Sequence, residues 1–141
     1  MEKNKIKIFC DGGSRGNPGP AGIGIIIGDK KYGEYIGEAT NNIAEYKAVI
    51  FALKKTKQLL GRKKSAEADL EIRVDSELLF KQMNAEYKIL DKKLQPLFIE
   101  VWNLKQDFKK VEFIQIKRED NAEADLLVNR TLNSLKSSLF S

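Results

Sequence analysis

The sequence predicts an α/β fold in which helices flank a mixed sheet of five strands. The chain has 141 residues, enough for one domain with a sizeable core. Its first 39 residues contain three short segments with β-type patterning and tight connections, which indicates an antiparallel meander. After the meander, segments with helical and β-type periodicity alternate, and this order favours parallel strands joined by helical crossovers.

The meander is expected to contain three strands. Residues 5–10 alternate between two sets of side chains, as a strand does. Residues 11–22 contain five glycines and two prolines, so this segment is expected to be a loop. Two further strands are expected at residues 23–28 and 31–39, where the pattern is again β-type.

A long, largely apolar helix is expected next, from about Asn42 to Gly61. Asn42 and Glu45 have the spacing of a capping box, and glycine is favoured directly after a helix. The remaining elements are expected to be a strand at 70–74, a helix from Asp75-Ser76 to residue 84, a helix at 96–108, a strand at 111–117 and a helix at 121–135. Ser and Asp are favoured N-caps, and Pro96 suits the first turn of a helix.

The composition excludes several kinds of catalysis. The chain has no histidine and a single cysteine, Cys10, which is expected to be a small buried residue. Catalysis by Ser-His-Asp or Cys-His groups is therefore excluded, as are an intramolecular disulfide and the common zinc sites. Carboxylates, lysines and hydroxyls remain, together with any metal that the carboxylates bind. No signal peptide or membrane-spanning run is apparent in the sequence, so we expect a soluble, cytoplasmic protein.

Four acidic residues stand at the boundaries of expected elements: Asp11, Glu45, Asp75 and Asp125. Each has an ordinary structural explanation, because turns, helix caps and solvated helix faces all favour acidic side chains. Asp11 and Asp75 would lie near each other if their strands were neighbours in the sheet. Several carboxylates that converge repel one another unless a divalent cation neutralises them.

Four segments of the chain resemble, in order, the four sequence motifs of the type 1 ribonuclease H family. They are DGGSRGNPGPAGIG at residues 11–24, TNNIAEYKA at 40–48, VDSELL at 74–79 and REDNAEADLL at 118–127. The resemblance covers about residues 5–133 and is closest to the archaeal-type and plant-like branch. It implies a ribonuclease H-like sheet and a single domain over residues 1–141.

The resemblance also implies a reaction and a metal site. Members of the family hydrolyse the RNA strand of RNA/DNA hybrids and leave 5′-phosphate and 3′-hydroxyl ends. Their catalytic and metal-binding carboxylates match Asp11, Glu45, Asp75 and Asp125, which would hold two Mg²⁺ or Mn²⁺ ions. Hard cations prefer oxygen ligands, and a pair of them can activate the attacking water and stabilise the leaving oxygen. The absence of histidine is therefore no obstacle.

The resemblance assigns further residues to the substrate. Those expected to read the 2′-hydroxyl groups of the RNA strand are Gly12, Gly13, Asn17, Asn41 and Asn42. Glycine lets the backbone approach the sugar, and an asparagine amide can donate and accept at once. Arg118 stands near the place where several relatives carry a histidine, so it is expected to hold a phosphate or to assist product release.

Two alternatives to a hybrid-specific enzyme stay open. The chain could be a catalytically weak or inactive module with this fold that binds nucleic acid, or an enzyme that also cleaves double-stranded RNA. All four carboxylate positions are filled, which favours an enzyme. The expected partner is an RNA/DNA hybrid, and we expect a monomer that does not bind membranes.

Overall fold

A five-stranded mixed sheet forms the centre of the molecule. The computed structural model describes residues 5–140, and the side chains of residues 5–135. The strands are β1 (Lys5–Ser14), β2 (Gly19–Ile27), β3 (Lys30–Ala39), β4 (Asp69–Val74) and β5 (Lys110–Gln115). They lie in the order β3-β2-β1-β4-β5, with antiparallel pairing along β1, β2 and β3 and parallel pairing along β1, β4 and β5. The predicted meander with crossovers is confirmed.

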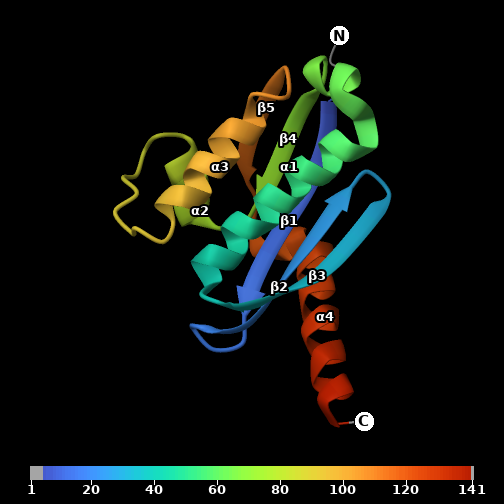
Figure 1. Cartoon of the computed structure of the whole chain (residues 1–141), viewed down its shortest axis with the longest axis vertical. Helices are drawn as coiled ribbons and strands as arrows, with labels where there is room; N and C mark the ends of the chain where they lie inside the picture. Colours follow the sequence, from blue (N-terminus) through green and yellow to red (C-terminus); the bar gives the residue numbers. More distant parts are fainter. Residues whose placement is uncertain (1–4, 141) are drawn as a thin grey trace.

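Helices lie on both faces of this sheet (Figure 1). They are α1 (Asn41–Ala66), α2 (Glu77–Met83), α3 (Gln95–Lys105) and α4 (Ala122–Phe140), and a 3₁₀ turn, η1 (Arg118–Asn121), precedes α4. Helices α1, α2 and α3 cover one face, whereas α4 crosses the other and extends past the end of the sheet. Among the helices of residues 5–140, none combines the length and the apolar character needed to cross a membrane.

The two faces of β2 explain why its sequence is so rich in glycine. Ile23 and Ile25 are buried in the core shared with α1. Gly24 faces the opposite way, and a Cβ atom there would lie 2.2 Å from the carbonyl oxygen of Ala124 in α4. A glycine is required because the helix backbone rests directly on the strand.

The prediction of a loop over residues 11–22 is wrong for most of that segment, because residues 11–14 belong to β1 and residues 19–22 belong to β2.

The ends of α1 also differ from the prediction. Thr40 is the N-cap, and its hydroxyl accepts a hydrogen bond of 3.2 Å from the backbone N–H of Ile43. The predicted capping box of Asn42 and Glu45 is wrong because the Glu45 carboxylate bonds to a strand instead. The helix does not end at Gly61 but continues to Ala66, with a local interruption where Gly61 has φ 84°. The final helix likewise runs beyond residue 135, to Phe140.

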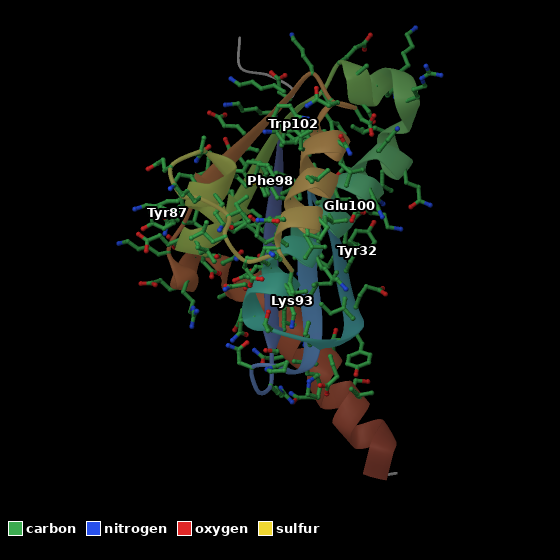
Figure 2. The ribbon with its side chains drawn as sticks, turned by 60° about the vertical axis from the view of Figure 1, so that its left-hand side comes forward. Tyr32, Tyr87, Lys93, Phe98, Glu100 and Trp102 are labelled. Carbon is green, nitrogen blue, oxygen red and sulfur yellow. The ribbon has the colours of Figure 1, made fainter. Side chains whose placement is uncertain are left out.

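A buried polar chain ties α1 to α2 and to the segment that follows. The Tyr46 hydroxyl donates to Gln82 Oε1 at 2.5 Å, and Gln82 Nε2 donates to the carbonyl oxygen of Lys88 at 3.2 Å. Both side chains are almost completely buried, and burial raises the pKa of Tyr46 to about 12. The segment held in this way forms one wall of a hollow of about 440 Å³, whose lining includes Tyr87, Phe98 and Trp102 (Figure 2).

Candidate active site

The acidic residues come from four different elements and meet at one end of the sheet. β1 and β4 are parallel neighbours, and their register pairs Phe9 with Arg73. Two residues further along each chain, the same register brings Asp11 beside Asp75. Glu45 reaches this place from α1, and one carboxylate oxygen from each of these three residues lies within 4.8 Å of the other two. The expected convergence of strand ends is confirmed, although Asp11 lies within β1 and not after it.

Asp125, the fourth acid, comes from the first turn of α4 on the opposite face of the sheet. Its carboxyl group is close enough to that of Asp11 to contribute to raising the pKa of Asp11. Asn129, one turn later in α4, donates to Asp125 Oδ2 at 3.2 Å. Arg15 in turn donates to Asn129 Oδ1 at 3.5 Å, which connects the turn after β1 to this helix.

Burial, together with the charges of neighbouring carboxylates, raises the pKa of Asp11 and of Glu45. Burial, followed by the charges of Asp75 and Asp125, raises the pKa of Asp11 to about 8. Burial, followed by the charges of Asp11 and Asp75, also raises the pKa of Glu45 well above its ordinary value. A Gly12 N–H hydrogen bond and the Arg118 charge act in the opposite direction on Glu45. The oxygen-only ligand set and its excess of acidic groups fit a divalent cation such as Mg²⁺ or Mn²⁺.

The acids line a cleft of about 500 Å³. Five residues expected to contact the substrate also line it: Gly12, Gly13, Asn41, Asn42 and Arg118. Asn17 does not belong to this lining. Its side chain instead accepts a hydrogen bond of 2.9 Å from the backbone N–H of Asn41, at the start of α1. Asn41 Oδ1 in turn accepts from the backbone N–H of Ser14 at 2.9 Å, so these side chains brace one wall of the cleft.

A close contact between β1 and α1 sets the position of Glu45. The Gly12 N–H donates to Glu45 Oε1 at 3.0 Å. A Cβ atom at Gly12 would lie 2.2 Å from the carbonyl oxygen of Ala44, which is inside any normal contact distance. The strand can approach the helix this closely only because residue 12 has no side chain. Gly12 therefore brings the two elements that carry Asp11 and Glu45 together.

Two asparagines at this site were not predicted from the sequence. Asn129 lines the cleft beside Asp125, and Asn121 is buried at the end of η1, where it bonds to Asp75. The signal in the sequence is their spacing of four residues on either side of Asp125, which would place all three on one side of a helix that began at Asn121. That spacing is common in helices and does not by itself indicate a site.

Comparisons with known proteins agree with this geometry. The sequence model of the family described as "Reverse transcriptase-like" matches residues 9–131. The solved structure of LC11-RNase H1 in complex with an RNA/DNA hybrid is 41% identical, with a TM-score of 0.86, and the match covers 92% of this chain and 98% of that one. RNase H1 from the halophilic archaeon Halobacterium salinarum is 34% identical, with a TM-score of 0.84 and coverage of 92% and 98%.

A longer relative is also similar. A bifunctional protein of Mycobacterium tuberculosis is 33% identical over 137 residues, which cover 92% of this chain. The match covers 36% of that protein, so the chain spans about a third of its length. The sheet order, the acidic cleft and these similarities over nearly the whole chain agree: the chain belongs to the type 1 ribonuclease H family.

Proposed function

We propose that this chain is an endoribonuclease that hydrolyses the RNA strand of RNA/DNA hybrids and leaves 5′-phosphate and 3′-hydroxyl ends. The observation that carries the proposal is the cluster of Asp11, Glu45 and Asp75, whose carboxylate oxygens lie within 4.8 Å of one another. The solved relative in complex with an RNA/DNA hybrid supports the choice of substrate.

The cofactors in this proposal are two divalent cations, Mg²⁺ or Mn²⁺. Asp11, Glu45, Asp75 and Asp125 would hold them, since these residues offer oxygen ligands at one place in the cleft. When bound, such a pair supplies Lewis-acid stabilisation and a water activated for in-line attack on the phosphate. The protein contributes the fixed arrangement of four carboxylates from both faces of the sheet.

The walls of the cleft would choose and orient the RNA strand. The backbone at Gly12 and Gly13 lines the cleft, and the Asn41 and Asn42 amides can bond to 2′-hydroxyl groups, which DNA lacks. In this proposal Asn17 contributes to substrate binding indirectly. Its side chain accepts a hydrogen bond from the Asn41 backbone and so holds the start of α1 in place. Arg118 is a fixed cation at the same cleft and would hold a phosphate before or after cleavage.

The proposal extends to the state of the protein in the cell. We infer a cytoplasmic monomer whose 141 residues form one domain and whose partner is an RNA/DNA hybrid. The net charge of +5 favours association with any nucleic acid, RNA or DNA, because both are polyanions. Selectivity for a hybrid must therefore come from the cleft.

Cleavage of matched RNA/DNA, RNA/RNA and DNA/DNA duplexes tests the proposed function. Wild type should cut only the RNA strand of the hybrid, with Mg²⁺ or Mn²⁺ and not with EDTA. Asp75→Asn should abolish cleavage without loss of fold, because it removes one charge from the metal site. Asp29→Asn, in the exposed turn between β2 and β3, is the matched control and should cut normally.

Each other outcome points to a different function. A hybrid that is bound but never cut would indicate a nucleic-acid-binding module. Equal cleavage of the RNA/RNA duplex would extend the substrate to double-stranded RNA. Normal activity of Asp75→Asn in Mg²⁺ would contradict the proposed metal site.

A further inference from the structure

Asn121 lies between β1, which carries Asp11, and Asp75, which directly follows β4. The pairing of β1 with β4 extends only to Phe9 and Arg73, so the acids lie just beyond the last pair. At this level, Asn121 Nδ2 donates to the carbonyl oxygen of Cys10 and to Asp75 Oδ2, each at 2.8 Å. One amide group therefore joins the backbone next to Asp11 to the side chain of Asp75.

The surroundings of Asn121 fix which way its amide points. Both partners are acceptors, so only the NH₂ group can face them. The residue is 1% exposed, and within the described part of the chain its Oδ1 is buried without a hydrogen-bond partner. Because Asn121 itself is buried, its NH₂ group has little access to water and stays bonded to these two acceptors.

We infer that Asn121 is a positioning residue that holds the Asp75 carboxylate in the orientation needed to bind a divalent cation with Asp11. The inference rests on the proposed metal site. Asn121 orients Asp75 through Oδ2 and leaves the other carboxylate oxygen unengaged by the amide. Being neutral, it adds no charge to the acidic cluster, whereas a lysine would compete with the cation and an aspartate would add to the repulsion.

A purely structural role for Asn121 makes a different prediction. If the amide only anchors η1 to β1, its loss lowers stability but leaves the folded site able to bind metal as before. If it orients Asp75, its loss also weakens metal binding, since removal of a group that orients a ligand typically reduces affinity about 10- to 100-fold. Metal affinity and stability therefore have to be measured separately.

The test compares Asn121→Ala with Asn103→Ala, which changes an exposed asparagine of α3 outside the cleft. Titration calorimetry with Mn²⁺ alone is done on the full chain without nucleic acid, and circular dichroism checks the fold. The Mn²⁺ dissociation constant should rise about 10- to 100-fold in Asn121→Ala and stay unchanged in Asn103→Ala. On a hybrid, kcat should fall in Asn121→Ala while KM stays the same. Wild-type Mn²⁺ affinity in folded Asn121→Ala would overturn the inference.

A measurement on the unmodified chain keeps the inference testable if the alanine variant does not fold. The side-chain NH₂ resonances of Asn121 should shift when Mg²⁺ is added, because Asp75 Oδ2 accepts from this group. Resonances that do not move as Mg²⁺ binds would overturn it. If wild type binds Mn²⁺ but cuts no hybrid, the proposed function fails while the comparison of Mn²⁺ affinities still decides the role of Asn121.

Discussion

Gly12 sets the distance between β1 and α1, and with it the distance between Asp11 and Glu45. In Gly12→Ala the new methyl group would overlap the Ala44 carbonyl, so the strand and the helix must separate. We expect a loss of about 1–3 kcal/mol in the free energy of unfolding, typical of overpacking, and a large loss of activity. Gly13→Ala is the matched control for stability, because its Cβ would meet its nearest neighbours at 3.9 Å. Urea unfolding of both variants measures the difference, and equal stability would contradict the close contact.

The protonation of Asp11 links stability to pH and to metal. Its pKa is raised from 3.8 to about 8 by burial and by neighbouring carboxylates, so the folded state without metal binds a proton more tightly than the unfolded chain does. This contribution to stability is fully present below pH 3.8 and is lost as the pH rises through about 8. In EDTA, thermal stability should therefore fall between these values. A loss of about 1 kcal/mol corresponds to roughly 2–4 °C in Tm for a domain of this size.

Two comparisons isolate this effect. Asp11→Asn should flatten the pH dependence in EDTA, because the replaced side chain no longer titrates. Saturating Mg²⁺ should raise the Tm of wild type most at pH 8, where the carboxylates are least protonated and the cation replaces their protons. A Tm in EDTA that rises between pH 5 and 8 would contradict the assignment.

Arg118 places a guanidinium group at the cleft. Because a guanidinium stays protonated, Arg118→Ala should lower cleavage by the same factor throughout pH 6–9. Arg118→Lys should restore only part of the activity, since a lysine cannot form the two-pronged contact of arginine with a phosphate. Steady-state rates on one hybrid across this range measure both effects. Unchanged rates in Arg118→Ala would remove Arg118 from the site.

At the scale of elements, the chain of hydrogen bonds from Tyr46 to Lys88 fastens α2 and its following segment to α1. Tyr46→Phe leaves Gln82 Oε1 buried without its donor, which typically costs about 1–3 kcal/mol. Tyr35→Phe removes the hydroxyl of a tyrosine that is 46% exposed, and should change stability by less than about 0.5 kcal/mol. Urea unfolding compares the two, and equal losses would mean that the buried chain contributes nothing.

At the scale of the whole molecule, the site exists only when distant parts of the chain are assembled. Asp11 lies on β1 and Asp125 on α4, at opposite ends of the chain and on different layers of the structure (Figure 1). Helix α4 packs against the sheet, where Gly24 admits its backbone. We propose that these layers fold as one cooperative unit.

This proposal predicts a single unfolding transition. Trp102, on α3, is the only tryptophan in the chain, and its fluorescence reports one side of the molecule. Far-UV circular dichroism reports all helices, α4 included. The two signals should give the same urea midpoint, whereas separate midpoints would mean that α4 detaches before the rest.

The sequence alone determined the features that depend on neighbours along the chain. Strand alternation, helix periodicity and helix caps are local patterns. They predicted that the strands and helices exist and in which order, and they predicted the N-cap at Ser76. Four motifs with their acids also appear in order, which was enough to predict the family and the convergence of Asp11 and Asp75. A local pattern predicts an element best where the interactions that form the element act within one or two turns of chain.

Only the tertiary structure decided which groups meet across space. Glu45 had a suitable place in a capping box, but it bonds to Gly12 because β1 passes within hydrogen-bond distance. Most of the glycines expected to form a loop lie in strands, because Gly12 and Gly13 of β1 pair with β2. Asn121 appears in the sequence as the start of a helix, yet it joins Cys10 to Asp75, 111 and 46 residues away. These partners are fixed by the packing of distant segments, and a buried polar group bonds to whichever acceptor that packing brings within reach.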